Sequence, residues 1–435
     1  MSTPAIFIRS QRQLRAMRFL AIGFFATLAV HAAEPSTAEF FFHDGDRAMI
    51  LGDSITQQHL YSTLVESYVV SRYPDWKITF RNTGWSGDTM NLRTRKGLDV
   101  GFDRDLKPLS PTAVTIDFGM NDARAGADGA AVYVDNARKL AGKFAAIGAR
   151  IAFVTSSPEE KYQDGQPAGS AYNNMLRKYS DGLRQVAAEK NLPFIDQLNP
   201  MIKVIEDGRS AGVLSKMEGG LRLVPDAVHP SIDGHMIMAA TILKGLNAPA
   251  LVSSVEINAV SGAVKSSKAT VTAVKTGGTL SFTRMDACMP WPVPAEIATV
   301  LKVPGFAPFD ELSVYTLKVT GLTAASYEVA ADGKSFGSYT GAQLAAGVNL
   351  AAAAFRALPE VKALYDAIIA KNALFYTRWR QVQVVEIPDW VPSEAVEQGR
   401  VKRLAELDAE LVKAEANVNS LRAPKAHQWT VSPAL

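Results

Sequence analysis

The chain has 435 residues, of which 47% are hydrophobic and 20% charged, with a net charge of +3 and one cysteine. This composition excludes a disordered or fibrous chain, and the length exceeds that of one ordinary compact domain. The single Cys288 excludes an intrachain disulfide scaffold and a cysteine-rich zinc site. Residues 1–33 contain four arginines and no acid, so the rest of the chain carries −1 and gives no argument for nucleic-acid binding.

Residues 1–33 predict a signal peptide. The arginines precede a 12-residue apolar stretch at 19–30, and two alanines follow it. Basic, apolar and small residues in this order are typical of a secretory signal, and the stretch is shorter than the ~20 residues of a membrane-spanning helix. Met1 and Met17 are alternative starts. We therefore expect a protein exported to the periplasm or the medium, without an integral membrane segment.

Residues 34–248 predict a first domain in which strands alternate with helices. Apolar runs predict strands at 48–51, 78–80, 113–118, 150–154 and 194–196, and helical spacing predicts helices at 59–73, 130–147, 170–190 and 234–245. This alternation predicts an α/β domain with a parallel sheet that is covered on both faces.

Residues 250–355 predict a β-rich accessory module. Period-2 alternation favours strands at 255–260, 269–274, 280–284, 312–319 and 327–331, with hairpin turns at Gly277-Gly278 and Asp332-Gly333.

Residues 356–435 predict a helical hairpin and a C-terminal tail, with helices at 361–383 and 394–422. The second helix has a narrow apolar seam, formed by Leu404, Leu407, Leu411, Ala414, Val418 and Leu421. Such a seam packs on one partner helix. Packing within the chain is the simplest account, and a dimerisation coiled coil is the alternative, so the oligomeric state stays open.

Four polar segments follow the predicted strands of the first domain. They are Gly52-Asp53-Ser54-Ile55-Thr56, Asn82 to Thr89, Gly119-Met120-Asn121-Asp122 and Asp226-Ala227-Val228-His229-Pro230. In open α/β sheets, ligands bind beyond the carboxyl ends of the strands. The sequence therefore predicts that these segments meet at one edge of the sheet.

The residue types in these segments fit acyl transfer. Ser54 is a candidate nucleophile at a strand-to-helix turn, His229 a candidate base, and Asp226 a group that can orient the imidazole. The backbone N–H of Gly87 and the side-chain amide of Asn121 are candidate donors to an oxyanion.

These segments resemble the four blocks of the GDSL, or SGNH, hydrolase superfamily over about residues 46–245, with Ile55 where the family label has leucine. The resemblance implies a flavodoxin-like three-layer α/β/α sandwich with a parallel five-stranded sheet. It also implies a catalytic triad of Ser54, His229 and Asp226, an oxyanion hole of Ser54, Gly87 and Asn121, and no cofactor. Gly84 is the alternative glycine donor.

Other residues support rival interpretations. The Gly-x-Ser-x-Gly pattern of a different esterase fold occurs around Ser210 and Ser335. Ser210 lacks the preceding strand that a nucleophile elbow requires, and Ser335 lies in a predicted hairpin of the β-rich module, after every candidate histidine except His427. Asp53 and Asp122 are alternative triad acids. No cluster has convincing metal-ligand spacing.

Three further side chains are candidates near the site. Trp85 and Trp291 are candidate substrate walls, with a buried hydrophobic plug as the alternative for each. His59 can line a pocket or simply pack at the start of its helix.

The sequence thus predicts an exported serine esterase that hydrolyses carboxylic esters, with acetyl esters of a carbohydrate as the favoured substrates. A lipase, a thioesterase or an acyltransferase of the same superfamily is the alternative. From a different class, the alternative is a non-catalytic carbohydrate-binding protein that works through residues 250–355. The partners expected are small-molecule or polysaccharide esters.

Overall fold

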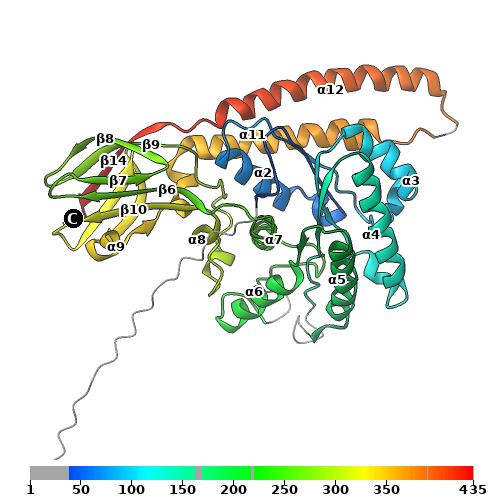
Figure 1. Ribbon diagram of the computed structural model, residues 1–435, viewed down its shortest axis with the longest axis horizontal. Coiled ribbons are helices and arrows are strands. Elements are labelled where there is room, and N and C mark those ends of the chain that lie inside the picture. The colour runs from blue at the N-terminus through cyan, green and yellow to red at the C-terminus, as the bar shows by residue number, and fades with distance from the viewer. Residues whose placement is uncertain (1–38, 162–168, 217–219, 389, 435) are drawn as a thin grey trace, which may run out of the picture. The chain divides into compact units, whose positions relative to one another are not determined.

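Five parallel strands form the central sheet of the computed structural model, which describes residues 39–161, 169–216, 220–388 and 390–434. They are β1 (Arg47–Gly52), β2 (Thr79–Asn82), β3 (Ala113–Asp117), β4 (Arg150–Val154) and β5 (Phe194–Ile195) (Figure 1). Their spatial order, β2-β1-β3-β4-β5, is the flavodoxin-like order. The predicted signal peptide at 1–33 lies outside the described residues.

Helices cover this sheet on both faces. On one side α2 (Leu60–Arg72) packs on α7 (Ile232–Gly245), and on the other α4 (Gly129–Ala146) packs on α5 (Ala171–Glu189). Right-handed crossovers between parallel strands produce this arrangement. The predicted α/β/α fold and its five-stranded parallel sheet are confirmed.

This region contains several further helices beyond those predicted from the sequence. They are η1 (Arg93–Arg95), α3 (Leu98–Gly101), η2 (Phe102–Leu106), η3 (Lys107–Leu109), η4 (Asp122–Ala125) and α6 (Leu198–Ser210). Most are too short for a helical period to stand out in the sequence.

Two further sheets confirm the predicted β-rich module. One has the order β13-β10-β6-β7, and the other has the order β12-β11-β14-β9-β8. Their strands are β6 (Leu251–Asn258), β7 (Val264–Ser267), β8 (Ala269–Lys275), β9 (Leu280–Asp286), β10 (Val314–Thr320), β11 (Ser326–Ala331), β12 (Lys334–Thr340), β13 (Val348–Asn349) and β14 (Ala426–Pro433). Both predicted turns join antiparallel strands, β8 to β9 and β11 to β12. Short helices α8 (Pro308–Leu312), η6 (Val300–Lys302), α9 (Gly341–Ala346) and α10 (Ala351–Ala357) lie between strands.

The two sheets pack face to face around a small set of large side chains. Trp429 of β14 is fully buried and contacts the rings of Tyr315 and Phe336. Arg284 of β9 is also fully buried and reaches across to Ser253 of β6, whose hydroxyl accepts from Nη2 at 2.8 Å. These contacts make the module a β sandwich.

The C-terminal segment is a strand of this sandwich rather than a tail. β14 pairs antiparallel with β11 on one side and with β9 on the other. Figure 1 shows this red segment among the green and yellow strands. The chain therefore leaves the sandwich, forms the helical hairpin, and returns to complete one of the sheets.

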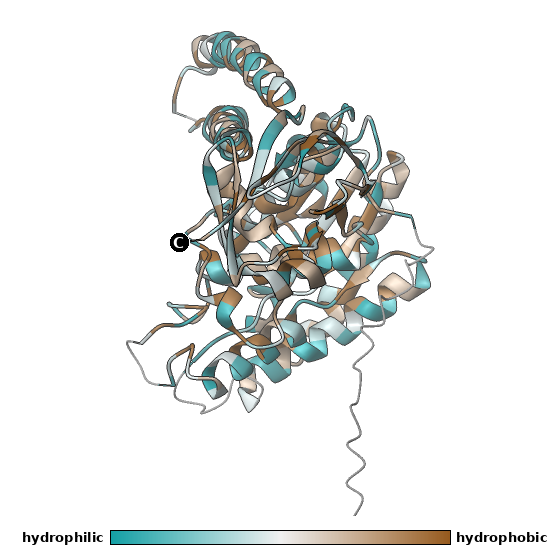
Figure 2. Cartoon of the chain, turned by 90° about the vertical axis from the view of Figure 1, so that its left-hand side faces the viewer, coloured by the Kyte–Doolittle hydropathy of each residue, from teal (hydrophilic) through white to brown (hydrophobic). Residues whose placement is uncertain are grey.

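The hairpin consists of α11 (Pro359–Tyr376), which continues as the π-helical segment η7 (Thr377–Gln383), and α12 (Ser393–Leu421). The two helices lie side by side (Figure 1). Leu407, Leu411 and Val418 of the predicted seam are buried, so the seam packs within the chain. The remaining α12 surface mixes hydrophilic and hydrophobic residues, as the uppermost helix of Figure 2 shows.

Buried polar contacts fasten α11 to α2 beside the central sheet. The Lys371 ammonium forms an ion pair of 2.5 Å with the Glu66 carboxylate, and both side chains are less than 5% exposed. Asn372 donates to the same carboxylate at 3.0 Å. At the far end of α12, the buried Arg422 donates to the backbone carbonyls of Trp76 and Ile78.

A second polar cluster joins the first turn of α11 to the sandwich. The His427 ring contacts Glu360 at 2.6 Å and Asp332 at 2.7 Å. The hydrogen bond with Glu360 raises the pKa of His427 to about 9, against the opposing effect of burial. The imidazolium is therefore charged at neutral pH and bridges two carboxylates from separate elements.

Among the described residues, no helix combines the length and apolar character needed to cross a membrane.

We expect Lys371→Met to destabilise the protein by about 3 to 5 kcal/mol, because it leaves the buried Glu66 carboxylate without its ammonium partner. The matched control is Lys362→Met on the same helix, whose exposed ion pair with Asp366 contributes about 0 to 1 kcal/mol. Chemical denaturation of both variants measures the difference. An equal loss of unfolding free energy in the two variants would contradict the role given to the buried ion pair. Adding Glu66→Leu to Lys371→Met should recover much of the lost stability, because it removes the unpaired carboxylate.

Candidate active site

The turn from β1 into α1 (Ser54–Gln57) presents the Ser54 side chain at the carboxyl edge of the sheet. A Cβ atom at Gly52 would lie 2.1 Å from the Thr56 hydroxyl and 2.7 Å from the Asp117 carbonyl, so the close approach requires glycine. The Asp53 carboxylate caps the helix by accepting from the Ile55 N–H at 3.0 Å. This turn leaves Ser54 partly exposed.

The structure brings three of the predicted residues together. The Ser54 Oγ lies 2.8 Å from Nε2 of His229, and Nδ1 of His229 lies 2.7 Å from Oδ2 of Asp226. A proton on Nδ1 is therefore directed at the carboxylate, which leaves Nε2 free to accept the Ser54 proton. The arrangement can generate a serine nucleophile.

A tight turn holds Asp226 and His229 in this relation. The Asp226 Oδ1 accepts from the backbone N–H groups of Val228 and His229 at 2.9 and 2.6 Å, and Ala227 has a left-handed backbone with φ of 73°. Burial opposes ionisation of Asp226, but the hydrogen bonds from His229 outweigh it and lower the pKa of the carboxyl group. Asp226 therefore remains an acceptor for the imidazole.

The two candidate glycine N–H groups differ in whether they already donate a hydrogen bond. The Gly84 N–H donates to Asn82 at 2.9 Å, whereas the Gly87 N–H makes no hydrogen bond within the described part of the chain. Gly87 also has a φ of 76°, which favours glycine.

The Asn121 side-chain amide donates to the Asp88 carbonyl at 3.0 Å, and its nitrogen lies 3.5 Å from the Asp53 carboxylate. Its second proton is therefore only weakly engaged.

A buried ion pair anchors the loop that carries Gly87. The Asp88 and Arg95 side chains are both 0% exposed, and Arg95 Nε donates to Asp88 at 2.7 Å. Arg95 also donates to the Thr83 carbonyl at 2.6 Å, so it ties both ends of the loop. Burial lowers the pKa of the guanidinium, and the adjacent Asp88 charge counteracts this effect.

Aromatic rings from separate parts of the chain enclose the Arg95 guanidinium. The Trp85 and Trp379 ring centroids lie 5.1 and 5.3 Å from it, within the range of cation–π attraction. Trp379 belongs to η7, so the continuation of α11 supports the Gly87 loop. The sequence analysis missed Arg95 because it lies in a stretch without an apolar period, and nothing in the sequence links it to Trp379.

The two tryptophans predicted as substrate walls have different positions. Trp85 is half-buried and packs on η7, where Arg380 lies 3.8 Å from its ring centroid. Trp291 is only 1% exposed, and its indole N–H donates to the Leu64 carbonyl at 2.9 Å. A side chain this buried cannot contact a substrate, so the prediction for Trp291 is wrong, and the alternative of a hydrophobic plug against α2 describes it.

The alternative triad acids make other contacts. Asp53 caps α1, and Asp122 accepts from the Met90 N–H at 3.0 Å. Burial raises the pKa of both carboxyl groups to about 7. Within the described residues neither contacts His229, whereas Asp226 does.

The remaining candidates lie elsewhere. Ser210 ends helix α6, and Ser335 lies in strand β12, where its hydroxyl donates to Glu328. Neither therefore has the strand–turn–helix setting of a nucleophile elbow. No three His, Cys, Asp or Glu side chains within the described ranges could together hold a metal ion.

The His235 side chain is buried beside the segment that follows Ser54. Its buried ring accepts from the Tyr61 N–H at 3.3 Å and contacts Gln58 at 2.7 Å, which links α7 to the segment after Ser54. Burial lowers the pKa of His235 to about 3, so this imidazole is neutral.

Part of the chain matches a known protein family. Residues 50–237 match the GDSL-like lipase/acylhydrolase family. A sequence search of curated proteins finds no match. Among solved structures, a gut microbial diltiazem-metabolizing enzyme is similar over 90% of this chain and 98% of its own, with 22% identity and a TM-score of 0.73. That similarity shows a shared fold that extends well beyond the central sheet.

Two smaller proteins are similar to about half of the chain. The acetylxylan esterase Axe2 from Geobacillus stearothermophilus has 23% identity and a TM-score of 0.40, with 48% of this chain and 96% of its own covered. The alpha/beta hydrolase LAE5 from the metagenome of Lake Arreo, Spain, has 20% identity and a TM-score of 0.39, with 48% and 98% covered.

We expect Arg95→Met to lower kcat for a small acyl ester by about 10- to 100-fold with little change in KM, because a displaced Gly87 loop weakens transition-state contacts. Arg95→Lys keeps the charge and should retain more activity. Arg138→Met, which removes only an exposed pair with Glu189, is the control. Steady-state kinetics alongside thermal unfolding checks this, and an unchanged kcat in folded Arg95→Met would refute it.

Proposed function

We propose that the chain is a carboxylic ester hydrolase whose catalytic triad is Ser54, His229 and Asp226, and the match of residues 50–237 to the GDSL-like lipase/acylhydrolase family supports this activity. The observation that carries this proposal is the continuous hydrogen-bonded path from Ser54 Oγ to His229, at 2.8 Å, and from His229 to Asp226, at 2.7 Å. Nucleophile, base and orienting acid are thus within direct reach of one another.

The reaction follows from these positions. His229 Nε2 takes the Ser54 proton as Oγ attacks the ester carbonyl carbon, and the N–H groups of Ser54 and Gly87 and the Asn121 amide stabilise the oxyanion. Collapse of this intermediate expels the alcohol, which takes the proton from His229. A water molecule then gives a proton to His229 as its oxygen attacks the acyl carbonyl carbon, and His229 returns this proton to Ser54 Oγ when the bond between Oγ and the acyl carbon breaks and the acid leaves.

A cavity beside Asn121 presents several hydrogen-bonding side chains, which supports a hydroxyl-rich alcohol, such as a carbohydrate, as the leaving group. The cavity has a volume of about 500 Å³, and Asn91, Arg93, Arg124 and Asn136 are among its lining residues. Their amide and guanidinium groups can hydrogen-bond to hydroxyl oxygens. With Trp291 buried, the carbohydrate proposal rests on this cavity.

The protein is further proposed to act outside the cytoplasm. The support is the order of basic, apolar and small residues at 1–33. N-terminal sequencing of the protein from its native host would locate the processed start.

Ser54→Ala should lower turnover of small acyl esters by about 10⁴-fold or more while the protein remains folded, because no other group in the site can form the acyl-enzyme. A fluorophosphonate probe should label the native protein at Ser54 and leave the variant unlabelled. Ser210→Ala, at the competing Gly-x-Ser-x-Gly pattern, is the control. Loss of activity in Ser210→Ala with activity retained in Ser54→Ala would overturn the proposal.

A carbohydrate esterase should release acetate from acetylated oligosaccharides more efficiently than it cleaves long-chain p-nitrophenyl esters, because the amide and guanidinium groups that line the cavity beside Asn121 can hydrogen-bond to sugar hydroxyl groups. Comparing kcat/KM for the two substrate series measures this preference. A steady rise of kcat/KM with acyl chain length would instead favour a lipase. Transfer of the acyl group to an alcohol in place of water would identify an acyltransferase.

A further inference from the structure

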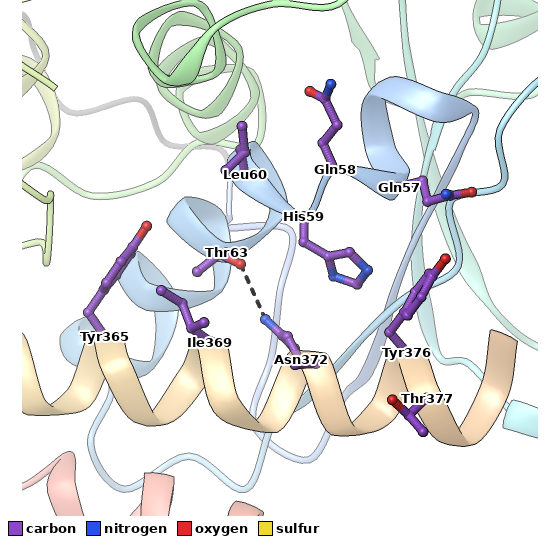
Figure 3. A pocket seen from close by; sticks show the side chains of 11 residues that line it. Gln57, Gln58, His59, Leu60, Thr63, Tyr365, Ile369, Asn372, Tyr376 and Thr377 are labelled. Carbon is purple, nitrogen blue, oxygen red and sulfur yellow. Dashed lines mark hydrogen bonds between the residues drawn. The ribbon is translucent and has the colours of Figure 1, made fainter. Parts of the chain in front are cut away.

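An apolar cavity of about 410 Å³ lies between helix α11 and the segment that follows Ser54. We call it the α2–α11 pocket. Figure 3 shows Tyr365, Ile369 and Tyr376 extending from α11 toward the segment that carries His59 and Thr63, and Leu60 also lines the cavity. Cavities of this size, lined mainly by apolar and aromatic groups with a few polar ones, are typical of small-molecule sites.

The pocket shares its wall with the catalytic loops. Gln57 ends the helix that Ser54 begins, and its side-chain carbonyl accepts from the Ser86 N–H, next to Gly87, at 2.7 Å. The backbone of Gly84 packs so closely on Gln57 that a Cβ atom would lie 2.3 Å from the Gln57 nitrogen. The pocket therefore adjoins both helix α1, which begins at Ser54, and the loop that carries Gly87.

The imidazole ring of His59, which forms part of this wall, is held in place by packing contacts alone. Both of its ring nitrogens are buried without a hydrogen-bond partner in the described chain, and its backbone is left-handed with φ of 63°. Each feature costs folding free energy, and such costs concentrate at functional sites. The ring stands edge-on to Tyr376, with 5.6 Å between the ring centroids.

The electrostatics keep His59 uncharged. Burial, together with the positive charge of Lys371, lowers the pKa of His59 to about 4. The neutral imidazole can turn toward a bound group without breaking a hydrogen bond, and it offers one donor and one acceptor. Asn372 and the Tyr376 hydroxyl are further polar groups on the α11 side of the pocket (Figure 3).

We propose that the α2–α11 pocket binds an aryl-sized apolar group of the ester substrate. This inference rests on the proposed function and deepens it, since an acetyl group alone would leave the pocket empty. The substrate is then an ester that combines a hydroxyl-rich part with an aromatic part. Helix α11 becomes part of the substrate-binding site.

The experiment fills the pocket with a larger side chain. Ala373 is an exposed α11 residue that lines the pocket, and Ala370, one turn earlier and also exposed, does not. Ala373→Trp and Ala370→Trp are therefore a matched pair of variants. The substrates are 2-naphthyl acetate, with the ring on the alcohol side, methyl 3-phenylpropionate, with the ring on the acyl side, and methyl acetate, which has no ring.

The expected result is a rise of about tenfold in KM for one of the two aryl esters in Ala373→Trp, because the ring loses its apolar contacts. Methyl acetate should be unaffected in both variants, and Ala370→Trp should resemble the native protein. The aryl ester that responds identifies the side of the ester bond that the pocket serves. An equal response of the two variants, or an equal loss for all three esters, would overturn the proposal.

Binding measured without turnover separates this proposal from the catalytic one. In the Ser54→Ala background, saturation-transfer NMR should detect 2-naphthol or 3-phenylpropionate, the products of the two aryl esters, and Ala373→Trp should abolish the signal. Failure of the triad would appear as Ser54-independent turnover of methyl acetate. Failure of the pocket would appear as aryl binding that Ala373→Trp leaves unchanged.

Discussion

The contact between the Ser54 hydroxyl and the His229 imidazole depends on two tight turns at one edge of a parallel sheet. One turn follows β1, where Gly52 lets the chain pass within contact of the Asp117 carbonyl. The other, from Asp226 to His229, is closed by hydrogen bonds to a single carboxylate and contains a left-handed residue. Both turns fix side-chain direction through the backbone, which is how a hydroxyl and an imidazole 175 positions apart come to lie at hydrogen-bond distance.

The C-terminal helices contact the elements that form this edge of the sheet. Lys371 fastens α11 to α2, the helix that follows the Ser54 turn, and Trp379 in η7 lies beside Arg95, which anchors the Gly87 loop. Buried charges need close partners to be tolerated in a protein interior. Residues from the second half of the chain therefore supply part of the environment of the buried Arg95, although the family match ends at residue 237.

The central sheet could be predicted because buried parallel strands appear in the sequence as short apolar runs. The polar segments after these strands could then be assigned to one edge, and the structure brings Ser54, Asp226 and His229 together there. Features that depend on distant contacts could not be predicted. The role of Arg95 depends on its contact with Trp379, which is remote in sequence. The sequence left two positions open for Trp291, a substrate wall and a buried plug, and only its contact with α2 distinguishes them.

The position of β14 has a consequence for how the protein is made. Because this strand lies between β9 and β11 but follows the helical hairpin in the chain, one sheet of the sandwich lacks an inner member until residues 426–433 have been synthesised. The edges of β9 and β11 expose unpaired backbone groups until then, and such edges readily recruit other strands. The helical hairpin must therefore be synthesised before the sandwich can close around β14.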